Sequence, residues 1–157
     1  MHLRRLASAD DLMPFLVLAM NWQPGRDWDA ERVWAAPEIA HYIEGWMRAG
    51  DDGVMAEDDG ASVGCAWWRF FNSSDPGYGY FADDVPEIGL AVTPAAQGRG
   101  VGRALLTALI DLARAQELPG LSLSVEDGND GARRLYDALG FAVVGRSGNA
   151  DTMLLRL

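Results

Sequence analysis

The sequence predicts an α/β fold in one domain, residues 1–157, with a mixed sheet of about seven strands and about four helices on its two faces. A chain of 157 residues, 49% hydrophobic and 23% charged, has the size and composition of one globular domain with a substantial core. Segments with alternating apolar residues are interspersed with segments whose apolar residues recur at helical spacing. After Val85 these segments come in the order strand, helix, strand, helix, which is typical of parallel pairing.

The first third of the chain is predicted to contain one strand and two helices. Residues 2–6 form the strand, and the S-x-x-D pattern of a capping box opens a helix over residues 8–20. Residues 21–35 contain three tryptophans but are too polar and interrupted for a regular core element. A second helix is expected over residues 37–50, because its apolar residues recur at helical spacing and the stretch ends at a glycine.

A hairpin and a long loop follow. Residues 52–57 and 61–71 are predicted to be strands, joined by an Asp-Asp-Gly turn. The loop of residues 72–84 has three aromatic residues among glycines and aspartates: Tyr78, Tyr80 and Phe81. Aromatic rings near carboxylates attract a cationic amine, but such rings also cover the edge of a core, and both interpretations stay open.

The second half of the chain is organised around a strand that turns through glycines into a helix. Every second residue of 86–92 is apolar, which predicts the strand, and helical spacing begins at Val101. Three glycines and two arginines occupy the turn: Gly98, Arg99, Gly100, Gly102 and Arg103. Glycines let a ligand approach the backbone, and the free N–H groups and dipole of a helix start favour phosphate, so we expect phosphate binding here.

The spacing of the glycines discriminates between known phosphate-binding motifs. A Walker loop needs a lysine, and all 13 basic residues of this chain are arginine. A dinucleotide fingerprint is also disfavoured, since Arg103 stands where its third glycine belongs. The pattern that fits is Q-x-x-G-x-G, carried by Gln97, Gly100 and Gly102.

A second motif lies downstream. After a predicted strand over residues 121–125, the pattern N-x-x-A-x-x-L-Y-x-x-x-G-F runs from Asn129 to Phe141, and two closing strands are expected at 141–145 and 152–156. In this order and at this distance, the two motifs resemble those of the GNAT superfamily of acyl-CoA-dependent N-acyltransferases. The resemblance covers roughly residues 85–145.

The resemblance implies that acetyl-CoA is the acyl donor and that the two motifs bind it. The residues expected to contact acetyl-CoA are the main chain of Leu90, Ala91 and Val92, the turn residues Gln97, Gly98, Arg99, Gly100, Val101, Gly102 and Arg103, and Asn129, Ala132 and Tyr136. The two early helices and their connection would wall the acceptor site, although their tryptophans are equally consistent with packing. As a bare residue, Asn129 is a helix N-cap.

Two residues are candidates for proton transfer. By resemblance, Tyr136 lies near the sulfur of the cofactor as general acid, and a phenol with a pKa near ~10 can protonate a thiolate. The alternative is that Tyr136 only packs on the apolar face of its helix. Glu87 stands where many superfamily members place a glutamate that acts as general base. It would need burial or a neighbouring like charge to raise its pKa from ~4.3 toward neutrality, and a solvated glutamate is the alternative.

Composition limits the partners and the compartment. A net charge of −10 argues against nucleic acid or an anionic membrane and suits a cationic amine. The single cysteine, Cys65, excludes an internal disulfide and a cysteine-rich zinc site and fits a reducing cytoplasm; no metal site is predicted. The apolar run at residues 12–20 is too short to span a bilayer and lacks a basic flank. We therefore expect a cytoplasmic protein, monomeric or homodimeric.

The predicted function is transfer of an acetyl group from acetyl-CoA directly to the primary amine of a small molecule or peptide. Two alternatives remain at this point. The first is an acetyltransferase that acts on protein N-termini or side chains, and the second is a CoA-binding module without catalysis.

Overall fold

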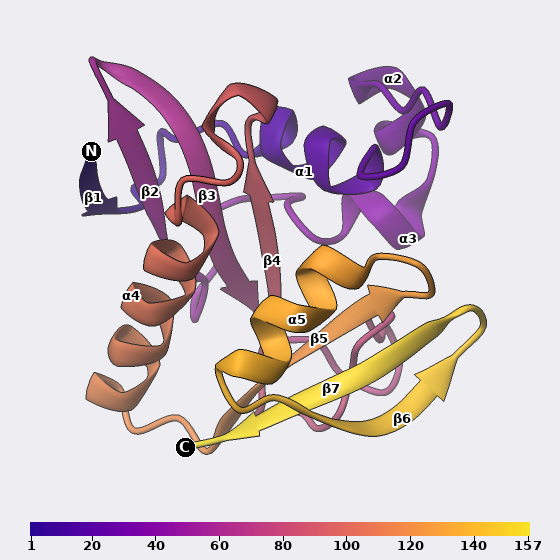
Figure 1. Cartoon of the computed structure of the whole chain (residues 1–157). Coiled ribbons are helices and arrows are strands. Elements are labelled where there is room, and N and C mark those ends of the chain that lie inside the picture. Colours follow the sequence, from indigo (N-terminus) through magenta and orange to yellow (C-terminus); the bar gives the residue numbers. More distant parts are fainter.

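The computed structural model describes the whole chain, Met1 to Leu157, and contains one seven-stranded sheet with helices on both faces (Figure 1). The strands are β1 (His2–Arg5), β2 (Asp52–Asp58), β3 (Ala61–Arg69), β4 (Glu87–Val92), β5 (Gly120–Glu126), β6 (Ala142–Ser147) and β7 (Ala150–Arg156). The helices are α1 (Met13–Met20), α2 (Ala30–Trp34), α3 (Pro37–Ala40), α4 (Val101–Ala115) and α5 (Asp130–Ala138), with a 3₁₀ turn at Pro94–Ala96. The predicted fold class is confirmed, with five α-helices where about four were expected.

The sheet opens in its middle. Its strand order is β1-β2-β3-β4-β5-β7-β6, and every neighbouring pair is antiparallel except β4 and β5. These two parallel strands share a single register pair, Glu87 with Ser122. Beyond that pair they diverge, and Figure 1 shows β4 and β5 running apart behind α5. The divergence leaves part of the β4 backbone without a neighbouring strand.

The free part of β4 can be identified from its bonds to β3. The N–H of Thr93 donates to the carbonyl of Val63 in β3 at 2.9 Å. Backbone N–H groups alternate sides along a strand, so the N–H of Ala91 also faces β3, whereas those of Leu90 and Val92 face β5. Because β5 has diverged at this level, the N–H groups of Leu90 and Val92 have no strand partner.

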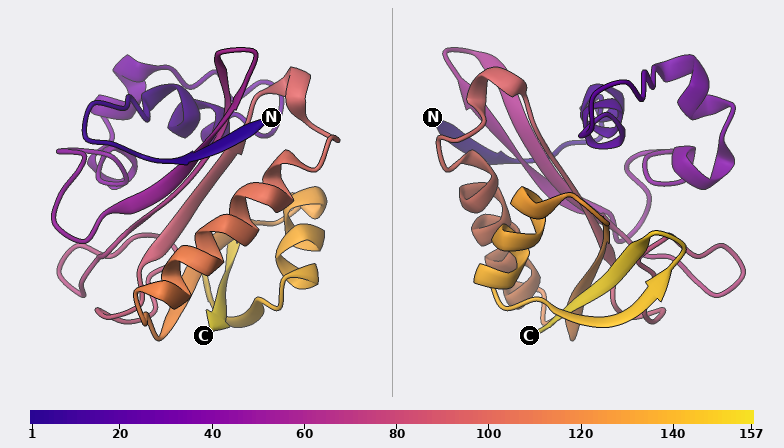
Figure 2. Two further views of the ribbon diagram at one scale, coloured as in Figure 1. Left: turned by 90° about the vertical axis from the view of Figure 1, so that its left-hand side faces the viewer. Right: turned by 45° about the vertical axis from the view of Figure 1, so that its right-hand side comes forward.

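The two faces of the sheet carry different helices, as Figure 2 shows. Adjacent residues of β3 illustrate the division, because side chains alternate along a strand. Trp68 is fully buried in the core that α4 and α5 cover. Trp67 is buried in the second core, beneath α1, α2 and α3, with Phe15 and Val33. The sheet is therefore sandwiched between two separate cores, as the sequence predicted.

The first predicted helix begins later than expected. The capping box predicted at Ser8 and Asp11 is wrong, because α1 starts at Met13, next to Pro14 in its first turn. Asp11 instead accepts the N–H of Met13 at 3.0 Å, and Asp10 accepts the N–H of Ala7 at 2.7 Å. The acidic residues thus close a turn before the helix.

The second predicted helix is also wrong over most of its length. Regular helix stops at Ala40, and the chain continues in tight turns. The buried guanidinium of Arg69 explains this, because its Nη1 donates to the carbonyls of His41 at 3.0 Å and Glu44 at 2.6 Å. Its other nitrogens bind the carboxylate of Asp51. The N–H of Arg48, which a helix would direct to the carbonyl of Glu44, donates instead to Asp51 at 2.7 Å, so the segment folds around the ion pair of Arg69 and Asp51.

Candidate active site

A cavity of about 370 Å³ lies between the diverging strands. Its walls come from both sides of the gap, with residues of β4 on one side, β5 and α5 on the other, and the segment from α1 to α3 above them. Three acidic residues and six large aromatic residues line it: Glu38, Glu87, Glu126, Trp22, Trp28, Tyr42, Trp67, Tyr78 and Tyr136. No arginine side chain belongs to the lining. The cavity therefore favours a cation over an anion.

Glu87 is buried at the start of β4, with 3% of its surface exposed. Burial raises its pKa from 4.5 to about 7, although a hydrogen bond from Tyr42 and the nearby backbone N–H of Gly79 oppose the rise. The Tyr42 bond joins its hydroxyl to Oε2 of Glu87 at 2.5 Å, and no group lies in hydrogen-bonding geometry to Oε1. The burial that a general base requires is thus present, and one carboxylate oxygen is left to accept a proton.

Sequence reasoning missed Tyr42, which is the residue that contacts Glu87. It follows α3 in the segment that was expected to be helical, 45 positions from Glu87 in the chain. Its hydroxyl also accepts the N–H of Tyr78 at 2.8 Å, which attaches the loop of residues 72–84. No pattern within the sequence pointed to this contact. A Cβ atom on Gly77 would lie 2.1 Å from Oε1 of Glu87, so glycine allows the loop to lie against the carboxylate.

Tyr136 is positioned by α5 and is 8% exposed. Its ring packs against Phe141 with a centroid distance of 5.9 Å, and the residue also lines the cavity. Burial alone raises the pKa of Tyr136 to about 12, so the phenol is protonated at neutral pH. Packing and access to the cavity are therefore compatible, and Tyr136 has a proton to donate.

The glycine turn before α4 presents a row of free backbone donors. The N–H groups of residues 98–103 donate to no other backbone group in the protein. Gly98 and Gly100 have positive φ angles of 75° and 79°, and a Cβ atom on either would meet nothing within 4 Å. Open space above unpaired N–H groups at a helix start suits the phosphates of a ligand.

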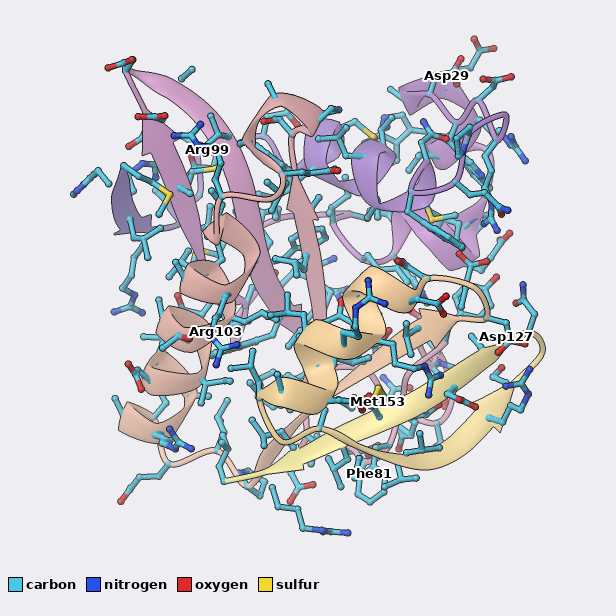
Figure 3. The ribbon with its side chains drawn as sticks, viewed as in Figure 1. Asp29, Phe81, Arg99, Arg103, Asp127 and Met153 are labelled. Carbon is cyan, nitrogen blue, oxygen red and sulfur yellow. The ribbon has the colours of Figure 1, made fainter.

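The other residues of the turn have separate contacts. Gln97 donates from Nε2 to the carbonyl of Val92 at 3.2 Å and so ties the turn to the end of β4. Arg99 binds Asp58 at 3.0 Å, whereas Arg103 projects from α4 without a carboxylate partner (Figure 3). Val101 is buried in the core beneath the helix. A Cβ atom on Gly102 would lie 3.4 Å from Leu135, so this glycine lets α4 approach α5.

Several predicted cofactor residues meet at the cavity. Leu90, Asn129, Ala132 and Tyr136 all line it. Asn129 precedes α5 as its N-cap residue, but its side chain makes no capping hydrogen bond. Val92 and the turn residues 97–103 do not line the cavity. Ala91 faces away from it, since its N–H faces β3 and its side chain is buried in the core beneath α1.

Glu126 on β5 connects this strand to the segment between α1 and α2. It accepts Trp22 Nε1 at 2.6 Å and Arg26 Nη1 at 2.9 and 3.0 Å. Although burial raises the pKa of Glu126, these hydrogen bonds and the charge of Arg26 lower it overall, so the carboxylate is ionised. Trp22 and Trp28 line the cavity, and Trp34 is 55% exposed outside it. Of the loop aromatics, Tyr78 lines this cavity, and Tyr80 and Phe81 line a neighbouring surface pocket.

A sequence model described as the acetyltransferase (GNAT) family matches residues 15–141. The chain belongs to this family. The resemblance of the two motifs is thereby confirmed, and at the level of the family so is the prediction of an acyltransferase enzyme. Among solved structures, the yncA protein of Salmonella typhimurium with its cofactor acetyl-CoA is similar to this GNAT chain. It has a TM-score of 0.72 at 25% identity, with 99% of this chain and 93% of that chain covered.

The names of two relatives specify a narrower activity. A mycothiol acetyltransferase of Acidimicrobium ferrooxidans is 35% identical over 129 residues, which cover 80% of this chain and 37% of that protein. The N-alpha-acetyltransferase RimI of Mycobacterium tuberculosis is 38% identical over 109 residues, which cover 66% of this chain and 63% of that protein. This GNAT chain spans about two fifths of the length of the mycothiol acetyltransferases that it matches.

The structure contains no group of three or more histidine, cysteine, aspartate or glutamate side chains arranged to hold a metal ion. None of its helices combines the length and the hydrophobicity needed to cross a bilayer.

Proposed function

We propose that residues 1–157 form one acetyltransferase domain, which transfers the acetyl group of acetyl-CoA directly to the primary amine of a small molecule or peptide. The main support for this proposal is that Glu87, Tyr136 and Leu90, whose backbone N–H has no strand partner, line the same cavity. A base, an acid and a backbone donor are the groups that acyl transfer to an amine requires. Family membership supports the same reaction.

The residues around the glycine turn fit acetyl-CoA. The unpaired N–H groups of residues 98–103 would receive its phosphates, and Arg103 would add positive charge. Leu90, Val92, Asn129 and Ala132 would contact the arm that leads from the phosphates to the thioester. When bound, acetyl-CoA supplies an acetyl group activated as a thioester.

Each step of the transfer has a residue in the proposal. Glu87 takes a proton from the acceptor ammonium, directly or through a water molecule, and leaves a nucleophilic amine. As the nitrogen bonds to the carbonyl carbon and the C–S bond breaks, the N–H of Leu90 donates to the carbonyl oxygen. Tyr136 gives its proton to the departing thiolate, and the second proton that the nitrogen loses as the amide forms restores the tyrosine hydroxyl. The products are the N-acetyl amine and CoA.

The lining of the cavity bears on the acceptor. Carboxylates and aromatic rings without an arginine favour an amine that carries no carboxylate or phosphate of its own. A protein N-terminus is the second candidate acceptor, because the relative named N-alpha-acetyltransferase RimI matches two thirds of this chain.

Thermal unfolding with and without acetyl-CoA tests the donor site. Ligand at about 100 times its Kd should stabilise the chain by ~2.7 kcal/mol, which raises the midpoint by roughly 5 to 10 °C. Amine-stimulated release of free thiol from acetyl-CoA then tests catalysis. An unchanged midpoint at millimolar acetyl-CoA would overturn the donor site. A raised midpoint without thiol release across small amines and peptide N-termini would favour the non-catalytic alternative.

A further inference from the structure

The two carboxylate oxygens of Glu87 have different surroundings. Oε2 accepts the hydroxyl of Tyr42 at 2.5 Å, while Oε1 is buried without a partner. Ser122 is the register partner of Glu87 on β5, but its buried Oγ also lacks a hydrogen-bond partner, so it does not hold the carboxylate. Tyr42 is therefore the side chain that fixes the orientation of Glu87.

Tyr42 also fixes the loop that covers Glu87. Its hydroxyl accepts the N–H of Tyr78 at 2.8 Å while it donates to Glu87, so one buried oxygen joins the loop to the base. The loop lies so close to Glu87 that a Cβ atom on Gly77 would be 2.1 Å from Oε1. On the far side of Tyr78, a Cβ atom on Gly79 would be 2.4 Å from the backbone of Leu123 on β5. The Gly-Tyr-Gly segment thus lies flat across β4 and β5 where they begin to diverge.

We propose that Tyr42 is the positioning residue of the general base: its hydroxyl holds Oε2 of Glu87 and anchors the loop at Tyr78, so that Oε1 is left to take the proton of the acceptor amine. The inference rests on the proposed function, because it assigns a reason for this contact within that reaction. Tyr42 lies outside both sequence motifs, the glycine motif of residues 97–102 and the second motif of residues 129–141.

Other charged groups surround this pair. Arg69 is the register partner of Glu87 on β3, and its guanidinium is bound to Asp51. His41 precedes Tyr42 and binds Asp75 of the loop at 2.9 Å. The remaining titratable groups that line the cavity are Glu38, Tyr78, Glu126 and Tyr136. Substitution of Tyr42 by phenylalanine removes none of these groups, nor the backbone N–H of Gly79 that also lowers the pKa of Glu87, so a shift in the titration of Glu87 would report the lost hydroxyl.

The test compares Tyr42→Phe with Tyr80→Phe. Both variants lose a tyrosine hydroxyl that donates to a carboxylate, but Tyr80 bonds Asp83 outside the cavity. In Tyr42→Phe we expect kcat to fall roughly 10- to 100-fold, because a misplaced base slows proton removal from the amine but does not weaken binding of the amine. The KM for the amine should change little. The acid limb of the kcat/KM profile should move to higher pH, because Glu87 loses the donor that opposes its protonation. Tyr80→Phe should behave as the wild type.

A second variant crowds the contact between Tyr42 and Glu87 without removing either side chain. Gly77 does not have a positive φ angle, but an added Cβ would lie 2.1 Å from Oε1 of Glu87 and 2.9 Å from the hydroxyl of Tyr42, so both groups must move. Gly77→Ala should lower kcat as Tyr42→Phe does. Folding of each variant is checked by the thermal shift on acetyl-CoA, which should be retained.

A titration that needs no turnover separates this inference from the proposed function. The carboxyl carbon of Glu87 is followed by NMR in protein labelled with ¹³C-glutamate, with Glu87→Gln as the assignment control. A midpoint that rises in Tyr42→Phe and stays unchanged in Tyr80→Phe supports the positioning role even if no amine is acetylated. Equal midpoints, or equal kcat and acid limbs in an active enzyme, would overturn it. Absence of thiol release in the wild type would count against the proposed function alone.

Discussion

At the scale of single residues, the proposed chemistry depends on the burial of Glu87, which lowers the stability of the folded chain when its carboxylate is charged. A glutamate with a pKa of about 7 binds its proton more tightly in the folded chain than in the unfolded chain. Between the ordinary pKa of 4.5 and about 7, folding is therefore linked to proton uptake at Glu87. As pH rises through this window the folded state loses that advantage, and above it the buried charge destabilises the fold.

The first prediction concerns Glu87→Gln, which carries no titrating group. Relative to the wild type, its free energy of unfolding should rise by roughly 3 kcal/mol from pH 4.5 to pH 8. Urea unfolding at a series of pH values measures this difference. The exposed Glu44→Gln is the control and should show no comparable trend. A difference that is the same at both pH values would mean that Glu87 titrates near its ordinary pKa.

The second prediction concerns Tyr136→Phe, which keeps the ring and its contact with Phe141. We expect kcat to fall by roughly 100-fold, because the departing thiolate loses its proton donor. The thermal shift on acetyl-CoA should be retained, since packing is preserved. Thiol release measured at neutral and high pH checks the assignment, and equal rates for variant and wild type at both values would contradict it.

At the scale of secondary-structure elements, local sequence patterns correctly predicted the segments whose structure depends on interactions between residues close in the chain. The strand over residues 86–92 and the helix from Val101 were predicted from periodicity and the glycines between them, and both form. The helix predicted over residues 37–50 stops at Ala40, and the chain beyond it folds around Arg69, which binds the carbonyls of His41 and Glu44. Residue spacing within a segment carries no information on an arginine from a distant strand.

The third prediction tests the glycine turn with a matched pair of substitutions. Gly100 and Gly60 have almost the same positive φ, 79° and 78°, and a Cβ atom on either meets nothing within 4 Å. Alanine at either position should destabilise the chain by about 1 kcal/mol. Only Gly100→Ala should also weaken acetyl-CoA binding, by about 10-fold, because its Cβ enters the space above the free N–H groups. Calorimetric titration with acetyl-CoA measures the difference, and equal affinities would remove the turn from the donor site.

At the scale of the whole molecule, the site exists because the sheet separates between β4 and β5. Glu87 and Tyr136 were predicted as site residues from motifs in their own segments. Tyr42, Trp22 and Arg26 could not be predicted in the same way, because their contacts with Glu87 and Glu126 join positions 45 to 104 residues apart. Such pairings depend on how the N-terminal segment packs over the open sheet.

The fourth prediction belongs to this scale. Glu126→Gln removes the charge that binds Arg26 and weakens the link between β5 and the segment between α1 and α2. We expect the KM for the acceptor amine to rise by about 10-fold, with the acetyl-CoA thermal shift unchanged, because a looser wall orients the acceptor less well. Glu31→Gln, on the exposed surface of α2, is the control. Steady-state kinetics with varied amine measure the effect, and an unchanged KM would show that the link does not shape the acceptor site.

The gap between β4 and β5 also determines how fast individual amides exchange with solvent. Hydrogens on Leu90 and Val92 lack the strand partner that protects other amides of the sheet, so they should exchange with deuterium quickly in the free chain. Ala91, bonded toward β3, should exchange slowly in the same strand. If acetyl-CoA occupies the gap, exchange at Leu90 and Val92 should slow markedly on binding, while Ala91 changes little. The exchange rates of these three neighbouring amides would thereby show whether the ligand pairs with the free edge of β4 and completes the sheet.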